Sequence, residues 1–260
     1  MPYDPFAPAA AGIENTETLL RTLAAKYETP AFVADDPVRF VHEARGAANK
    51  ETTGLVASCL SYGSRSQFIP KIAGIVAEAG GDVHSWIREG GFEKTFLPGD
   101  QTCFYRIFPR GKMAAFFARL RAILLEHGTL GAFVKSGAKD AVGAVEEFCK
   151  AFADSGCAPV IPQDTSSACK RLCMFMRLMV RTGSPVDAGL WDWIDPRTFV
   201  DPLDVHVARQ ARKLGLLYSR APTMQAALGL TLRLAEVFPD DPLKGDFALY
   251  GLGIDQGVTG

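Results

Sequence analysis

The sequence predicts an all-α protein, and three observations carry that prediction. Apolar residues recur at helical spacing along almost the whole chain. The two segments that could be extended, 30–33 and 103–108, show no second run to pair with. Helix-breaking Pro and Gly residues are spread evenly, without a low-complexity linker or an internal repeat. We therefore expect a single helical domain over residues 1–260, arranged in two lobes, because the one candidate boundary, 135–143, is too short to separate two domains.

The helices are expected in the following order. Asn15 is a good N-cap for a first helix that continues through Ala24, although the N3 position holds Thr18 rather than Glu or Gln. A helix that begins at about Arg65 should end at Gly80, since glycine is favoured just past a helix C-terminus. The other helices are expected at about 50–62, 112–127, 141–154, 167–181, 203–214, 223–237 and 242–252.

The composition is that of an ordinary globular protein. Hydrophobic residues make up 48% of the chain and charged residues 22%, which excludes a disordered or fibrous protein. Lys and Arg total 28 against 29 Asp and Glu, a formal net charge of -1. A protein that coats nucleic acid by bulk electrostatics should be more basic, so only a localised basic patch remains compatible with nucleic acid.

The compartment is expected to be the cytoplasm. No apolar run approaches the roughly 18–20 residues that a membrane helix needs, and the first residues show neither the basic nor the apolar region of a signal peptide. The six cysteines lie in apolar segments without zinc-binding spacing, which indicates buried, reduced thiols. We therefore expect no membrane contact, no metal and no cofactor.

The segment 162–181 places a lysine at the start of a helix. Asp164, Thr165, Ser166 and Ser167 are all good N-caps, so Lys170 and Arg171 should lie in the first turn. The helix dipole is positive there, which favours the neutral, nucleophilic form of a lysine amine. The rest of the helix is nearly all apolar and should be buried, with Arg177 and Arg181 in structural ion pairs. A solvated lysine on a core helix is the alternative.

The segment 200–216 places a carboxylate at another helix start. Pro202 suits the first turn and Gly215 the C-terminal end, so Asp204 lies where an anion is favoured. Helix capping is the simplest role for it. His206 follows two residues later and does not share a helical face with Asp204, so an Asp–His dyad is not expected.

These two segments resemble a known group of enzymes. The run from Pro202 to Gly215 is similar to the Val-Asp-Thr-His-Val-x-Arg signature of helix-hairpin-helix DNA glycosylases, and Glu51–Gln67 resembles the Ile-Leu-Ser-Gln-Gln helix and turn of that fold. The whole chain looks more closely like a bacterial family of unknown function that is distantly related to that superfamily. The motifs that carry this second resemblance, within residues 50–254, are Ser167–Leu172, Met179–Arg181, Ser184–Trp191, Pro202–His206 and Asp241–Gly253.

The chain departs from the glycosylase pattern in two places. The hairpin sequence Leu-Pro-Gly-Val-Gly, which binds a DNA phosphate through backbone amides, is replaced by residues 160–168. The four-cysteine iron–sulfur loop of the endonuclease branch is absent, since no cysteine follows Cys173. The wide spacing between Lys170 and Asp204 and the unusual hairpin are similar to the archaeal oxoguanine glycosylase branch.

The resemblance implies a fold, an activity and two catalytic residues. The fold would be helix-hairpin-helix glycosylase-like, with a cleft between two helical lobes. Lys170 would be the Schiff-base lysine and Asp204 the catalytic aspartate of a base-excision repair glycosylase and AP lyase, acting on a damaged base such as an oxidised purine in DNA. Two alternatives stay open: an inactive nucleic-acid or partner-binding module, and an enzyme that acts on a free nucleobase, nucleoside or other small molecule.

Further residues are weaker candidates for substrate or DNA contact. Arg65 and Gln67 begin a helix where glycosylases bring polar side chains near DNA, and Arg171 and His206 flank the implied catalytic pair. Trp191 could stack on a flipped base, with core packing as the alternative. A basic run with interleaved aromatic residues could follow a phosphate backbone or form a charged helix face; its members are Arg106, Arg110, Lys112, Arg119 and Arg121.

Overall fold

The structure, a computed structural model, describes residues 13–256 and confirms the all-α class. Its only β-structure in that range is a short two-stranded sheet. The α-helices are α1 (Ile13–Tyr27), α2 (Arg39–Glu43), α3 (Ala47–Leu60), α4 (Arg65–Glu78), α5 (Val83–Arg88), α6 (Arg110–His127), α7 (Leu130–Gly137), α8 (Ala141–Phe152), α9 (Lys170–Val180), α10 (Val205–Lys213), α11 (Met224–Val237) and α12 (Lys244–Asp255). The described residues also form the 3₁₀ helices η1 (Pro30–Asp35), η2 (Gly91–Lys94) and η3 (Pro196–Thr198) and the strands β1 (Cys103–Tyr105) and β2 (Phe108–Pro109).

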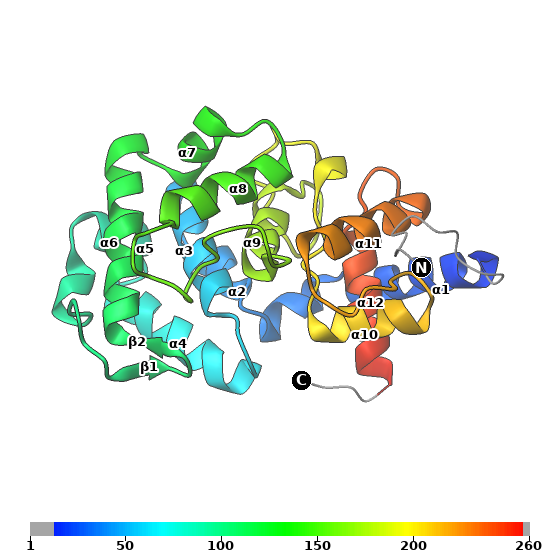
Figure 1. Ribbon diagram of the computed structural model, residues 1–260, viewed down its shortest axis with the longest axis horizontal. Helices are drawn as coiled ribbons and strands as arrows, with labels where there is room; N and C mark the ends of the chain where they lie inside the picture. Colours follow the sequence, from blue (N-terminus) through cyan, green and yellow to red (C-terminus); the bar gives the residue numbers. More distant parts are fainter. Residues whose placement is uncertain (1–12, 257–260) are drawn as a thin grey trace.

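The helices pack as two groups (Figure 1). The first group is α2–α9, in which α3 packs against α9 and lies centrally. The second group is α1 together with α10, α11 and α12, so the first and last helices of the chain lie side by side. One hydrophobic core of buried side chains runs through both groups, from Leu20 in α1 to Leu249 in α12. Within residues 13–256, no helix combines the length and the apolar character that crossing a membrane requires.

Two predicted helix starts are wrong. The first helix already includes Ile13, so Asn15 lies inside α1 and does not cap it. Helix α9 begins at Lys170 with Cys169 as its N-cap, in the left-handed region at φ 46°. Asp164 instead accepts hydrogen bonds from the backbone N and the hydroxyl of Ser166, and such a local turn competes with helix formation. Lys170 nevertheless occupies the first turn, as predicted.

The two segments that were candidates for extended structure differ from each other. Residues 30–35 form the 3₁₀ helix η1. Residues 103–109 fold back on themselves, with Tyr105 paired to Phe108 in an antiparallel hairpin. The partner run was therefore inside the same segment, joined by a turn with Arg106 at φ 47°. A non-glycine residue in this conformation gives little turn signal in the sequence.

Three short helices, α2, α5 and α7, were not expected, and α7 covers part of the candidate boundary at 135–143. Two of them begin at a side-chain cap, since Asp82 accepts from Ser85 N and Thr129 from Ala132 N. Each is too short to show a full apolar repeat in the sequence. All six cysteines are free, and five of them are buried as expected, whereas Cys103 is exposed.

Candidate functional site

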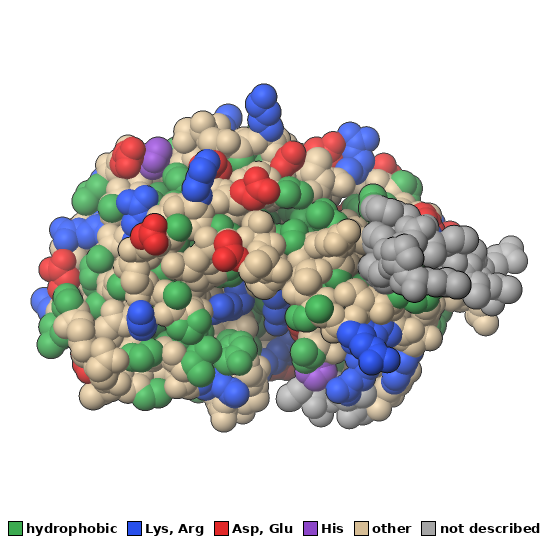
Figure 2. All heavy atoms as spheres, in the orientation of Figure 1, with side chains coloured by type: hydrophobic (Ala, Val, Ile, Leu, Met, Phe, Trp, Pro, Cys, Tyr) green, Lys and Arg blue, Asp and Glu red, His purple; other side chains and the backbone are tan. Residues whose placement is uncertain are grey.

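A cavity of about 530 Å³ lies between the two groups of helices, where the surface is hollowed (Figure 2). The α2–α9 group contributes the turn between α3 and α4 and the α9 residues Lys170, Met174 and Arg177. The second group contributes the start of α10 and one face of α12. The charged lining residues are balanced in sign: Asp36, Asp204 and Asp246, and Arg65, Lys170 and Arg177.

Lys170 and Asp204, which the resemblance pairs, meet in this cavity. Lys170 Nζ lies 3.4 Å from Asp204 Oδ2, and their side chains are 35% and 21% exposed. Asp204 is the N-cap of α10, and its Oδ1 accepts hydrogen bonds from the backbone N of His206 and Val207 at 2.8 Å. One carboxylate oxygen therefore caps the helix while the other faces the amine. Capping and proximity to Lys170 are compatible roles of the same side chain.

A buried ion-pair network adjoins the cavity. Arg177 Nη1 donates to Asp246 Oδ2 at 2.5 Å, and Arg177 Nε donates to Asp187 Oδ1 at 3.3 Å. Asp187 also accepts from Arg181 Nη1 at 2.5 Å. The prediction of structural ion pairs for Arg177 and Arg181 is therefore confirmed. Because Asp246 lines the cavity, the network joins the cavity wall on α12 to the buried arginines of α9.

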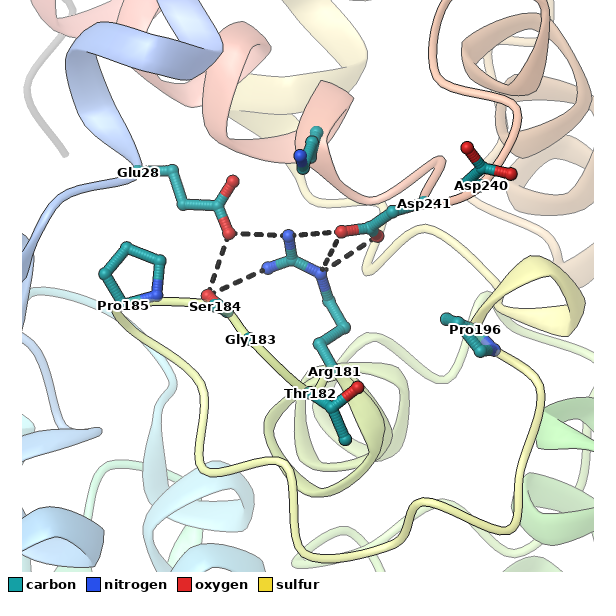
Figure 3. Close-up of a pocket in the computed structure, with 10 residues that line it drawn as sticks. Glu28, Arg181, Thr182, Gly183, Ser184, Pro185, Pro196, Asp240 and Asp241 are labelled. Carbon is teal, nitrogen blue, oxygen red and sulfur yellow. Dashed lines mark hydrogen bonds and ion pairs between the residues drawn. The ribbon is translucent and has the colours of Figure 1, made fainter.

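Arg181 also lies against a second cavity, of about 260 Å³ (Figure 3). Its guanidinium group donates to both carboxylate oxygens of Asp241, to Glu28 at 2.6 Å and to Ser184. With the bond to Asp187, the guanidinium group is surrounded by acceptors from its own chain. We therefore assign Arg181 to holding the end of α9 and the 182–187 loop to the segments just after α1 and just before α12, and not to ligand binding.

Two buried carboxyl groups lie near the Lys170–Asp204 pair. Burial raises the pKa of Asp201 well above its usual range, and the nearby carboxyls of Asp246 and Asp204 raise it further. Burial likewise raises the pKa of Asp246, against the opposing effect of Arg177. Within residues 13–256, neither carboxylate oxygen of Asp201 has a hydrogen-bond partner. The surroundings of Asp201 therefore favour the neutral form of its carboxyl group over the charged form.

Aromatic rings form another wall of the cavity. The Phe32 ring packs edge-on against Phe247 and Tyr250, with centroids 5.3 and 5.5 Å apart. The Arg65 guanidinium lies 5.6 Å from the Phe32 ring and 5.4 Å from the Tyr250 ring, and Arg65 Nη2 donates to Asp36 at 2.8 Å. Burial raises the pKa of Asp36, and Arg65 opposes this. This wall offers ring faces beside Lys170 and Asp204.

The other predicted contact residues divide between the cavity and the scaffold. Arg65 and His206 line the cavity, and within the described chain His206 Nδ1 is buried without a partner. Gln67, Arg171 and Trp191 do not line it. Gln67 accepts from Arg106 Nη1 at 3.2 Å.

Arg171 and Trp191 have internal partners instead. Arg171 donates to three backbone carbonyls, those of Cys59, Pro159 and Val160, at 3.1, 2.8 and 2.7 Å. Trp191 is buried, and its Nε1 donates to Glu51 at 2.8 Å. These placements are explained by packing: a planar guanidinium satisfies loop carbonyls, and a buried indole N–H needs an acceptor.

The basic run also lies on the scaffold. Four of its five members donate to backbone carbonyls of neighbouring segments: Arg110 to Thr95, Lys112 to Gly156, Arg119 to Ala151 and Arg121 to Arg88. These cations hold α6 to the chain around it. The structure therefore favours the alternative of a helix face with structural contacts.

Sequence reasoning did not find Asp36, Asp246 and Tyr250 as cavity residues. Asp246 and Tyr250 lie in the quoted motif Asp241–Gly253, and their spacing of four places them on one face of α12. That spacing was a usable signal. Asp36 gave none, because it lies in a short connection after η1. Among the described residues, no group of three or more His, Cys, Asp or Glu could hold a metal ion.

Comparison with known proteins gives one family. The family model described as "Protein of unknown function (DUF2400)" matches residues 36–255, so it spans most of the chain, including every cavity residue from Asp36 onward. No curated protein matches the chain, and no solved structure does.

Proposed function

The chain belongs to this family of unknown function, and on that premise we propose that it is a DNA-repair glycosylase and AP lyase that acts through an imine on Lys170. The observation that carries the proposal is the 3.4 Å distance between Lys170 Nζ and Asp204 Oδ2 inside a cavity. A helix-hairpin-helix glycosylase-like fold of two lobes belongs to the same proposal. Its support is that Lys170 opens the helix that follows an irregular connection after α8.

The chemistry follows from the two side chains. The Lys170 amine, once it has lost its proton, forms a bond from Nζ to C1′ of a flipped nucleotide as the glycosidic bond breaks. The base leaves with the bonding electron pair and takes up a proton. The C1′–O4′ bond then opens to give an imine, and the second proton of Nζ passes to O4′. The Asp204 carboxylate stabilises the positive charge that develops on the sugar and accepts a proton from the ammonium group.

The cavity has the size and lining for a flipped nucleotide. Its volume of about 530 Å³ lies in the range of small-molecule sites, roughly 300–1,000 Å³. Phe32, Phe247 and Tyr250 offer ring surfaces for a base. Asp36 and Asp246 are carboxyl groups that would meet the N–H groups of a base edge, and an oxidised purine carries such groups.

Borohydride trapping tests the proposal. Duplex oligonucleotides with oxidised, deaminated, alkylated or abasic sites are incubated with the protein and borohydride, which reduces an imine to a stable amine. The wild type should give a covalent adduct, and the lesion that is trapped identifies the substrate. Lys170→Gln should give none. Asp204→Asn keeps the helix cap but loses the charge, so base excision should fall by roughly 100-fold or more.

Lys244→Gln is the matched control, because it removes an exposed lysine from the other cavity. It should be trapped as the wild type is. A blank for the wild type over the whole panel would refute the lyase, and an adduct that persists in Lys170→Gln would refute the assignment of the imine to Lys170.

The same cavity volume suits a second candidate, an enzyme that acts on a free nucleobase or nucleoside. Base release from free nucleosides by the wild type, without a DNA adduct, would identify that activity.

A further inference from the structure

One segment of the chain has an unbalanced charge. Residues 205–220 contain four Lys or Arg residues and no Asp or Glu, whereas the whole chain is nearly neutral. These four residues, Arg209, Arg212, Lys213 and Arg220, are all exposed, and we call them the α10 basic patch. In Figure 2, Lys and Arg side chains gather over α10, beside the hollow between the two groups of helices. The rest of the chain is therefore net acidic.

Two of the four cations have an internal role. Arg212 donates to the carbonyls of Ser219 and Arg220 at 2.8 and 3.1 Å, and Lys213 donates to Gln256 at 2.7 Å. Both lie in the last turn of α10, where the helix dipole favours cations. Arg209 lies before that turn, and Arg220 follows the helix. Neither makes an ion pair within the described chain, so both are available to an external anion.

The patch adjoins the reactive pair along a single helix. The N-terminal end of α10 carries Asp204, His206 and Val207 into the cavity. Arg209 lies three residues after the cavity residue His206, so it shares a helical face with His206 and with Arg212 and Lys213, three and four residues on. A polyanion bound along this face would therefore pass the mouth of the cavity. By contrast, the charges inside the cavity are balanced, and the cations of α6 donate to the chain around them.

We propose that the α10 basic patch binds the phosphodiester backbone of a nucleic acid and guides one nucleotide to the cavity. This inference rests on the proposed function and locates its DNA-binding surface. The exposed side chains beside the patch fit this partner. Val205 is 69% exposed and Tyr218 is 46% exposed, and they offer apolar and aromatic surface to sugars and bases.

Binding of labelled DNA tests the patch. The probe is a fluorescent duplex with a tetrahydrofuran abasic-site analogue, which no imine can capture, and anisotropy gives Kd between 50 and 200 mM salt. The double variant Arg209→Gln, Arg220→Gln should weaken Kd about tenfold. The slope of log Kd against log salt should fall by about two, because two phosphate contacts are lost.

The matched control is the double variant Lys139→Gln, Lys150→Gln, which removes the same net charge at α8. It should bind as the wild type does. If both double variants lose the same DNA affinity, the effect depends on net charge alone. If the patch variant loses no affinity, the patch does not bind DNA. Either result overturns the inference. Tighter binding of the wild type to poly-glutamate than to DNA would assign the patch to an acidic protein and overturn it as well.

The borohydride assay separates this inference from the proposed function. At saturating lesion DNA, the patch variant still has Lys170 and should form the adduct. If the patch variant binds DNA weakly and the wild type forms no adduct, the DNA-binding surface is supported and the lyase activity is refuted. If the wild type forms the adduct and the patch variant has an unchanged Kd, the lyase is supported and the patch is refuted.

Discussion

At the scale of single residues, the site depends on carboxyl groups in three different states. Asp204 faces Lys170 and caps α10, Asp246 is bound to Arg177, and Asp201 has no partner within the described chain. The helix-start signals predicted where Lys170 and Asp204 lie, and the resemblance to DNA glycosylases predicted that the two side chains would meet. The buried state of Asp201 could not be predicted, since only the packing of both helix groups excludes water from it.

Asp201 should make stability depend on pH. In the unfolded chain an aspartate ionises near pH 3.9, whereas burial raises the pKa of Asp201 in the folded chain. The folded state therefore binds a proton that the unfolded state has lost, and this stabilisation declines as pH rises from about 4 toward the raised pKa. Asp201→Asn has no proton to lose. Urea unfolding should show the wild type losing stability relative to this variant between pH 4.5 and 8, by about 1.4 kcal/mol per unit of pKa difference.

Both proteins contain Asp36, whose raised pKa contributes equally to the two curves. A constant difference between wild type and Asp201→Asn across that pH range would mean that Asp201 is ionised in the folded protein.

At the scale of elements, α9 is held by Arg171. Its guanidinium group joins the end of α3, through the Cys59 carbonyl, to the loop before α9, through the carbonyls of Pro159 and Val160. Arg171→Lys cannot reproduce this fork of donors, because an ammonium group is a compact point donor. We expect a loss of about 2–3 kcal/mol in the free energy of unfolding, measured by urea denaturation.

Arg209→Lys is the comparison for that measurement, since Arg209 is exposed and makes no ion pair in the described chain. It should stay within about 0.5 kcal/mol of the wild type. If Arg171→Lys unfolds at the same urea concentration as the wild type, the hydrogen bonds from Arg171 to the three carbonyls add nothing to stability that lysine cannot supply.

The long helices could be predicted to within a few residues, because each is long enough to repeat its apolar residues at helical spacing. Helix α6 was expected at 112–127 and covers Arg110–His127. The start of α9 could not be predicted, because Cys169 adopts a left-handed conformation that its residue type does not favour. The short helix α5 was missed since a cap at Asp82 starts it and few residues follow. Local sequence therefore predicts the elements that are long enough to show a repeat of apolar residues.

At the scale of the whole molecule, the chain closes on itself through α1 and α12. Gly251 of α12 lies directly under the Tyr27 ring, and a Cβ at that position would overlap the ring. Lys26 forms an ion pair with Asp255 at 2.8 Å in the same contact. The sequence contained both helices but nothing that paired the first with the last, because the pairing depends on residues more than 200 positions apart.

Gly251→Ala should loosen this closure. The added methyl group forces Tyr27 away, at a cost of about 1–3 kcal/mol, so Tm should fall in a circular-dichroism melt. Gly74→Ala is the matched control, because a Cβ on that helical glycine meets nothing within 4 Å. Gly74→Ala should raise stability by roughly 0.5–1 kcal/mol through helix propensity. A Gly251→Ala protein that melts above the wild type would show that Tyr27 has room to move.

The Lys170–Asp204 distance is set across the joint between the two groups of helices, since α9 belongs to one group and α10 to the other. Neither α9 nor α10 alone brings the two side chains together. A molecule that keeps every helix but lets the groups separate would therefore retain its secondary structure and lose its reactive pair. Under the proposed function, activity would require this tertiary closure, and separation of the two groups would abolish it without changing the far-ultraviolet spectrum.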